Sequence, residues 1–162
     1  MISAKEARKH LRYVASTGQL WWRIRASGRR MNRPAGSLAV QGYITVTVCG
    51  KSYKAHRLIW LMQTGRWPKP EADHKNTIRR DNRWRNLREA TRSQNRMNCS
   101  LHKNNTSGHK GVSWHKQHKK WYVTIQKRGK PKFVGLFDDF IPACRAYKFA
   151  SNKHFGEFAR AS

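Results

Sequence analysis

Two adjacent residues near the middle of the chain, Asp73 and His74, could together activate water at a phosphorus atom. Cutting a phosphodiester bond requires an activated water, a cation that neutralises the developing oxyanion and a group that stabilises the leaving oxygen. His74 suits the role of general base because an unperturbed imidazole titrates near neutrality. Asp73 and Asn95 offer hard oxygen ligands, which suit Mg²⁺ or Mn²⁺ better than Zn²⁺. These residues indicate a hydrolytic site with one divalent ion.

The segments around these residues predict two helices that flank two short strands. Apolar residues at helical spacing after His56 predict a helix that ends at Thr64-Gly65. The stretch 71–87, which is rich in Asn, Asp and Arg, predicts two short extended pieces around an irregular loop. Thr91 then predicts the start of a helix that reaches residue 97 or 98. The order strand, loop, strand, helix would position the candidate residues.

Each candidate residue also has a purely structural explanation. Adjacent side chains of a strand point to opposite faces, so Asp73 and His74 can share a site only near a strand end. His56 precedes a helix and is interpreted as a hydrogen-bonding structural residue. Asn86 is either a loop-fixing asparagine or an indirect participant in the chemistry. Asn95 would be interpreted as a solvent-facing helix residue if Asp73 were absent.

The charge of the chain indicates a polyanionic partner. Thirty-five Lys and Arg stand against eight Asp and Glu, which gives a formal net charge of +27 and an isoelectric point near 11.3. Such a field favours nucleic acid and disfavours neutral or cationic ligands. Charge alone does not separate a DNA-binding enzyme from an RNA-binding structural protein.

Arginines are dense around the candidate site, and without phosphate such a group would repel itself. They are Arg79, Arg80, Arg83, Arg85, Arg88, Arg92 and Arg96. Several are interpreted as clamps on the DNA backbone, with Arg83, Arg85, Arg92 and Arg96 as the predicted DNA-binding residues. The nearby carboxylates of Asp81 and Glu71 are predicted to pair with arginines rather than with a metal.

Cysteine usage and hydropathy limit the location. Cys49, Cys99 and Cys144 are scattered, which argues against a zinc ribbon and a disulfide framework and favours a reducing cytoplasm. No apolar run has the length of a membrane span, and residues 1–15 are charged and amphipathic rather than a signal peptide. We expect a cytoplasmic protein, in the bacterial host cell if a phage encodes it.

The N-terminal region predicts a helix followed by a sheet. Apolar residues spaced by three and four predict a short amphipathic helix over residues 3–14. Strand-like runs at 19–23 and 43–48, separated by glycine turns, predict a small antiparallel sheet within residues 19–55.

A second module is predicted after a polar linker at 99–106. Three strand-like runs around 112–114, 121–126 and 133–137 precede a helix whose N-cap falls at Asp138-Asp139. Alternation on the middle strand divides its side chains between two faces. Trp121, Val123 and Ile125 are predicted to face the helix, whereas Tyr122, Thr124 and Gln126 are predicted to face outwards. Trp114 and Trp121 are predicted to pack in the core.

Residues 56–98 resemble a known nuclease family. His56-Arg57-Leu58, Asp73-His74, Asn86-Leu87 and Asn95, with the flanking NRWRNLREATRSQN at 82–95, look like the H-N-H signature of the ββα-metal nucleases. The segment is similar more narrowly to the HNH homing endonucleases of phages. The resemblance implies that His74 is the general base, that Asp73 and Asn95 hold one Mg²⁺ or Mn²⁺ ion, and that Asn86 fixes the loop and orients the base.

Residues 107–158 resemble the AP2/ERF DNA-binding domain. The similar positions are Gly111-Val112, Trp121, the run 134–138, Ala143 with Ala146-Tyr147, and the run 155–157. The resemblance implies a three-stranded sheet in the major groove with a helix packed behind it. The arginines that usually read guanine from these strands are missing. The DNA-contact candidates are Lys110, Ser113, His115, Thr124, Gln126, Lys132 and Phe133, of which Gln126 could pair with adenine.

The sequence therefore predicts an α+β protein with an HNH nuclease domain at 1–98, a linker at 99–106 and an AP2/ERF-like domain at 107–162. We expect a metal-dependent endonuclease that nicks or cleaves duplex DNA. One active site per chain and no heptad repeat predict a monomer without a protein partner, which favours nicking. Two alternatives stay open: a non-catalytic DNA-binding regulator on an HNH scaffold, and an RNA-binding structural protein.

Overall fold

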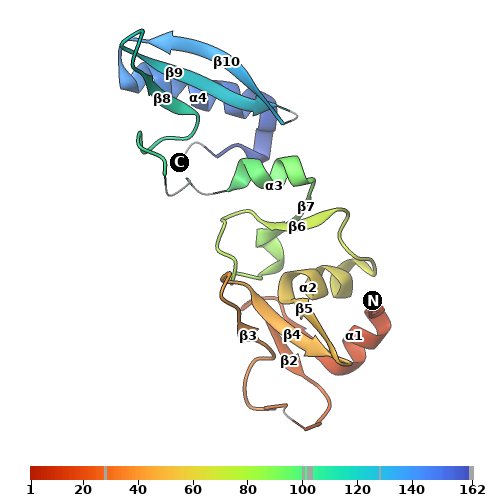
Figure 1. Cartoon of the computed structure of the whole chain (residues 1–162). Helices are drawn as coiled ribbons and strands as arrows, with labels where there is room; N and C mark the ends of the chain where they lie inside the picture. The colour runs from red at the N-terminus through yellow and green to blue at the C-terminus, as the bar shows by residue number, and fades with distance from the viewer. Residues whose placement is uncertain (28, 100, 102–103, 128, 161–162) are drawn as a thin grey trace. The chain divides into compact units, whose positions relative to one another are not determined.

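A computed structural model of the chain describes all residues except 28, 100, 102–103, 128 and 161–162 (Figure 1). The predicted α+β class is confirmed, because small antiparallel sheets alternate with four α-helices in the described part. The chain forms two compact units, Met1–Thr91 and Arg92–Ser162. The predicted linker includes residues 100, 102 and 103, which lie outside the described residues, and the predicted domain limits remain predictions. No helix within the described ranges is long and apolar enough to cross a bilayer.

The first unit begins with helix α1 (Ala4–His10), which ends earlier than predicted. Strand β1 (Leu11–Val14) follows directly and pairs with β2 (Gln19–Trp22) in an antiparallel hairpin. The predicted helix over 3–14 is therefore wrong in its second half. Leu11 is buried from a strand instead, because its pairing with Trp22 overrides the local helical spacing.

A separate three-stranded sheet follows, so the single sheet predicted within 19–55 is also wrong. It has the order β3 (Ser37–Leu38), β4 (Ile44–Val48), β5 (Lys51–Lys54). Helix α2 (Ala55–Thr64) then ends at Gly65, whose φ of 80° suits a left-handed helix cap. The core of the unit is formed by buried residues of α2, β1 and β4, including Leu58, Ile59, Leu11, Val46 and Val48.

The segment that carries the candidate site forms a short hairpin in the same unit. Strand β6 (Glu71–His74) pairs with β7 (Leu87–Ala90), and the single-turn helix η1 (Trp84–Asn86) leads into β7. The expected order of two short strands around an irregular loop is confirmed, but the second strand begins only at Leu87, where the predicted stretch 71–87 ends.

The second unit begins with helix α3 (Arg92–Asn98) and continues with three strands and a long helix. Strands β8 (Val112–His115), β9 (Lys120–Lys127) and β10 (Lys130–Phe137) form an antiparallel sheet with β9 in the middle. Helix α4 (Phe140–Phe155) covers one face, and η2 (Gly156–Phe158) follows it.

The core of the second unit lies between this sheet and α4. Val123 and Ile125 are buried beneath α4, and Trp121 packs on Phe140 with ring centroids 4.7 Å apart, as predicted. Trp114 is 48% exposed, so its predicted place in the core is wrong. Its ring contacts only the edge of this cluster, through Trp121.

Candidate active site

Asp73 and His74 are the last two residues of β6, where they lie opposite Arg88 and Leu87 of β7. The requirement that they occupy a strand end is therefore met. Both are buried, with 6% and 4% of their surface exposed. Residues of these types are seldom buried without polar partners. Those partners come from β7 and from the loop 75–86 that joins the two strands.

Asp73 is held by an ion pair with Arg88. Its Oδ2 lies 3.0 Å from both Nε and Nη2 of the guanidinium, and the two side chains are only 7% and 8% exposed. The guanidinium thus holds this carboxylate through one hydrogen bond, from Nε, and through its charge. The structure thus places Arg88, which the sequence grouped with phosphate clamps, on the candidate metal ligand.

His74 is held by Asn82, a residue that the sequence did not single out. Nε2 of His74 lies 2.9 Å from Oδ1 of Asn82, and Asn82 is itself buried. Burial lowers the pKa of His74, opposed by the Asn82 hydrogen bond and by the negative charges of Asp73 and Asp81. The imidazole is therefore neutral at pH 7 and able to accept a proton.

His56, in the first turn of α2, packs on the candidate base. Its ring meets that of His74 edge-on at 4.8 Å and lies 5.2 Å from the ring of Tyr43. Burial, together with the charges of His74, Lys54 and Arg57, lowers the pKa of His56 to about 3. His56 is 4% exposed, as a structural residue would be, but the predicted hydrogen bond is not seen at its Nδ1, which is buried without a hydrogen-bond partner among the described residues. Its contact with His74 was not predicted.

Asn86 closes the loop between the strands. Its Oδ1 accepts a 3.0 Å hydrogen bond from the backbone N–H of Asn76, and its Nδ2 donates to Asn76 Oδ1 and to the carbonyl oxygen of Asp81 at 2.9 and 2.7 Å. This loop also carries Asn82. Asn86 thus closes the loop that carries Asn82, as a loop-fixing residue would, and its part in orienting His74 remains a prediction.

Comparison with known proteins identifies the segment that contains this site. Residues 53–97 match the family described as HNH endonuclease. The chain is also 32% identical over 111 residues to Protein 3.8 of Escherichia phage T7, an alignment that covers 68% of this chain and 91% of the relative. Residues 53–97 therefore form an HNH endonuclease domain, and the chain belongs to the same family as this phage protein. No solved structure matches it.

The HNH segment runs from β5 of the first unit to α3 of the second, and its last predicted ligand lies on α3. Asn95 is half-buried there, and its role beside Asp73 remains a prediction. A different group, Glu6 and His10 of α1 with Cys49, brings three potential ligand atoms within 4.8 Å of one another. Thiolate and imidazole ligands suit Zn²⁺ rather than Mg²⁺, so this group does not match the predicted ion.

The arginines of the HNH segment differ in their freedom to contact DNA. Arg83 forms two hydrogen bonds with the carboxylate of Asp81, at 2.7 and 2.6 Å. The predicted pairing of Asp81 with an arginine is therefore confirmed, and this pairing lowers the pKa of Asp81 below its usual range. Arg85 is exposed on η1, and Arg92 and Arg96 are exposed on α3.

In the second unit, most DNA-contact candidates share the sheet face that α4 leaves open, which we call the outer face. It carries Ser113, His115, Tyr122, Thr124, Gln126 and Phe133. The ring of Tyr122 stacks on that of Phe133 at 5.3 Å and lies 5.8 Å from that of His115. Phe133 is 53% exposed. The exposed Phe133 ring, stacked on the half-buried Tyr122, offers an apolar contact to bases.

Two predicted contacts lie elsewhere in the second unit. Lys132 pairs with Ile125 across the sheet, which places it on the side of α4 rather than on the outer face. Nζ of Lys110 donates a 2.6 Å hydrogen bond to the carbonyl oxygen of Met97, and burial lowers the pKa of Lys110. The structure thus separates both lysines from the remaining candidates.

Three predicted DNA contacts do meet at one hollow of the second unit. Arg92 and Arg96 of α3 line it together with Gln126 of β9, and its volume is about 270 Å³. Two cationic side chains beside a hydrogen-bonding amide suit a phosphate and an adjacent base edge.

Proposed function

We propose that the chain is a metal-dependent endonuclease of the homing type that hydrolyses phosphodiester bonds of duplex DNA. The observation that carries this proposal is the buried, neutral His74, which Asn82 holds at the end of β6 beside Asp73. A base must be unprotonated and fixed in position, and a structural histidine has no need of a neighbouring carboxylate.

In this mechanism His74 takes a proton from water, which attacks the phosphorus atom. The Asn82 hydrogen bond and the His56 ring hold the His74 ring on two sides. The ring therefore does not have to be oriented during the proton transfer. Arg85 is free on the surface to hold a flanking phosphate. The loop that Asn86 closes keeps these groups in register.

Asp73 and Asn95 would hold one Mg²⁺ or Mn²⁺ ion. Both offer oxygen donors, as this class of cation prefers. Arg88 donates a hydrogen bond to Oδ2 of Asp73 and so holds this carboxylate in place. When bound, the ion neutralises the developing oxyanion and stabilises the leaving oxygen.

The second unit would position the duplex. By its resemblance to AP2/ERF domains, the outer face would enter the major groove, with Gln126 as the base-reading residue and Phe133 against a thymine methyl group. Arg92 and Arg96 would add backbone contacts. Deleting residues 106–162 should then weaken and broaden binding without removing cleavage.

One observation favours a second candidate, a non-catalytic DNA-binding regulator. Arg88 already forms an ion pair with Asp73. The negative charge that would attract a metal ion is therefore compensated within the protein. In that case the HNH segment would serve only as a scaffold.

Nicking of supercoiled plasmid in Mg²⁺ or Mn²⁺ separates the two candidates. We expect metal-dependent nicking that EDTA stops and that His74→Ala lowers by a factor of about 100 or more, with duplex affinity unchanged. His154→Ala, on α4, is the matched control and should cleave normally. Undiminished cleavage by His74→Ala would remove the assigned base. Tight duplex binding without cleavage in either metal would favour the regulator.

A further inference from the structure

Residues 23–27 and 29–33 of the first unit have neither helix nor strand structure and lie outside the HNH segment, and we call them the arginine loop. It contains five arginines, Arg23, Arg25, Arg29, Arg30 and Arg33, and no carboxylate. Indeed no Asp or Glu occurs between Glu6 and Glu71. None of the five arginines forms an ion pair with a residue that the structure describes. Their charge is compensated by no neighbouring acid along this stretch.

The ends of the arginine loop are fixed to the hairpin below it. Pro34 forms a bridge with Trp21 of β2, and the N–H of Ala35 donates a 2.6 Å hydrogen bond to the carbonyl oxygen of Leu20. Leu20 and Ala35 are both buried. The backbone at the ends of the loop is therefore held in place. Four of the five arginine side chains are exposed to solvent.

Arg29 has both a ring contact and a hydrogen bond within its own loop and hairpin. Its guanidinium lies over the ring of Trp22, 4.5 Å from the centroid, and its Nη1 donates a 3.1 Å hydrogen bond to the carbonyl oxygen of Ile24. An arginine stacked on an aromatic ring keeps its remaining N–H groups for other acceptors. Because the side chain is already held in place, less conformational entropy is lost when a ligand binds to it.

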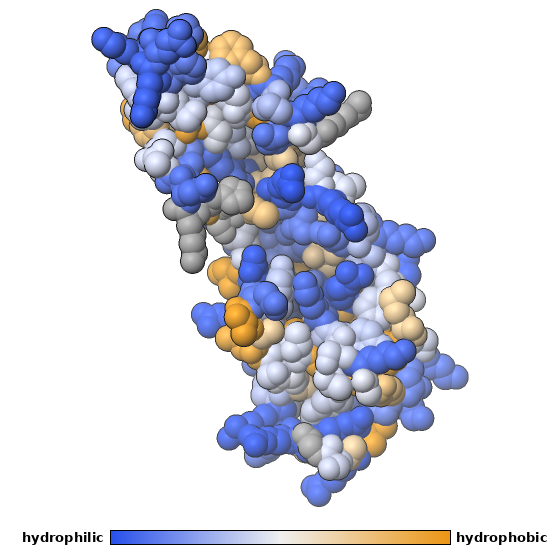
Figure 2. Space-filling view, viewed as in Figure 1, coloured by the Kyte–Doolittle hydropathy of each residue, from blue (hydrophilic) through white to orange (hydrophobic). Residues whose placement is uncertain are grey.

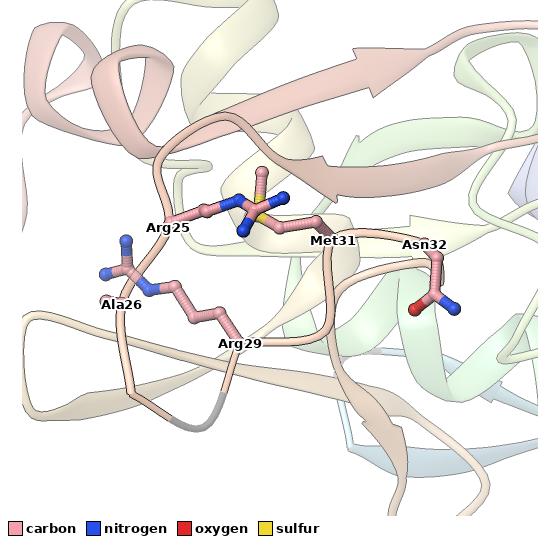
Figure 3. A pocket seen from close by; sticks show the side chains of 5 residues that line it. All are labelled: Arg25, Ala26, Arg29, Met31 and Asn32. Carbon is pink, nitrogen blue, oxygen red and sulfur yellow. The ribbon is translucent and has the colours of Figure 1, made fainter.

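Two adjoining hollows are lined by this loop. One, of about 580 Å³, is formed by Arg25, Ala26, Arg29, Met31 and Asn32. Figure 3 shows the Arg25 side chain reaching towards Met31 and that of Arg29 turned back towards Ala26. The other, of about 660 Å³, shares Arg29 and adds Arg30, Arg33 and hydroxyl groups of β4. No carboxylate lines either hollow among the residues described.

We infer that the arginine loop is a separate binding surface for the phosphate backbone of the duplex that the HNH domain cuts. Guanidinium groups bind phosphate oxygens in pairs, and hydroxyl and amide groups from Thr45, Thr47 and Asn32 suit the same oxygens. Apolar and metal ligands are disfavoured by the local charge. Figure 2 shows that the visible face of the molecule is largely hydrophilic, with small apolar patches. The five arginines of the loop, without a carboxylate among them, suit a polyanion rather than an apolar partner.

This inference rests on the proposed function for its choice of duplex DNA, and the test uses equilibrium binding so that cleavage does not enter. The full chain is titrated in EDTA against a fluorescein-labelled duplex at several NaCl concentrations. The loop variant carries Arg25→Gln, Arg29→Gln and Arg30→Gln. The control variant carries Arg145→Gln, Lys148→Gln and Lys153→Gln on the exposed side of α4, which removes the same charge.

The loop variant should bind at least about tenfold more weakly, and its plot of log K against log salt should be less steep by about 0.9 per lost phosphate contact. The control variant should change far less. A double variant, Arg25→Gln with Arg30→Gln, keeps the packing of Arg29 on Trp22 and should show about two-thirds of the change in slope. Circular dichroism confirms that each variant is folded.

Equal losses of duplex affinity in the loop and control variants would show that only net charge matters, and would overturn the proposal. Unchanged affinity in the loop variant would overturn it as well. A loss confined to an RNA duplex of the same sequence would assign the surface to RNA instead. Plasmid nicking by the wild-type chain is scored separately. Failure to nick would therefore count against the proposed function while leaving the binding result intact.

Discussion

The hairpin of β6 and β7, which we call the HNH hairpin, buries its polar residues, whereas the sheet of the second unit exposes them on its outer face. Around β6 and β7, Asp73, His74 and Asn86 are buried and bonded to partners inside the unit. On the outer face of the second unit, Gln126 and Phe133 are exposed. Chemistry at a phosphorus atom needs groups fixed before the substrate arrives, whereas binding needs donors and rings that a duplex can reach.

This difference predicts two kinds of mutational effect. Substitutions in the HNH hairpin should lower the free energy of unfolding, because they leave buried polar groups without partners. Substitutions on the outer face should leave stability nearly unchanged and affect only DNA binding. A variant that crossed these categories would break the comparison.

The largest effect is expected for Arg88→Ala, which leaves the buried Asp73 carboxylate without its cation. Removing one member of a buried ion pair costs about 3 to 5 kcal/mol of unfolding free energy. The measurement is urea unfolding followed by tryptophan fluorescence, with the exposed Arg85→Ala as control. If Asp73 binds the metal, Mg²⁺ should restore part of the lost stability. A loss below that of the control would show that Arg88 does not hold Asp73.

The next effect is a dependence of stability on pH that originates at His56. Its pKa is about 3 in the folded chain and 6.5 when unperturbed, so the unfolded state binds the additional proton. Stability is therefore complete above pH 6.5 and falls as the pH drops from there towards 3. The slope for one such proton is about 1.4 kcal/mol per pH unit.

His56→Asn should remove about one proton from this pH dependence. Urea unfolding in EDTA at several values between pH 4.5 and pH 7.5 provides the comparison. An unchanged slope in His56→Asn would show that His56 titrates normally in the folded chain and is not buried beside His74.

These effects depend on residues that the sequence predicted unequally. The order of the segments around Asp73 and His74 could be read locally, from turn-forming residues and helix signals. The partners Asn82, Arg88 and His56 could not, because their contacts depend on how loop 75–86 folds and on how α2 packs. Only the pairing of Arg88 with Asp73 could have been predicted, if the strand register of the short hairpin had been assigned from the sequence. The helix predicted over 3–14 failed for a similar reason, since pairing of β1 with β2 outweighed local periodicity.

A smaller loss of stability is expected for Asn86→Ala, which removes three side-chain hydrogen bonds that close the loop. The groups left behind at Asn76 and Asp81 are partly solvated, so we expect a loss of about 1 to 3 kcal/mol. Cleavage should fall more than stability alone explains, because Asn82 would hold His74 less firmly. Asn152→Ala, on the exposed side of α4, is the control. Normal cleavage by a destabilised Asn86→Ala would show that the loop does not position the base.

The smallest effect is expected on the outer face, and it should appear only in binding. Gln126→Ala removes an exposed amide that could pair with adenine. The free energy of unfolding should be unchanged, whereas the free energy of binding to a cleavable duplex should weaken by about 1 to 3 kcal/mol. A single amide makes no ionic contact, so the salt dependence should stay that of the wild type. Selecting bound sequences from a random duplex pool with both proteins tests the base preference directly. If Gln126 reads a base, one position of the selected sequences loses its adenine in the variant. If the two selections agree and only affinity falls, Gln126 meets the backbone, and the outer face would act through shape and charge rather than through base edges.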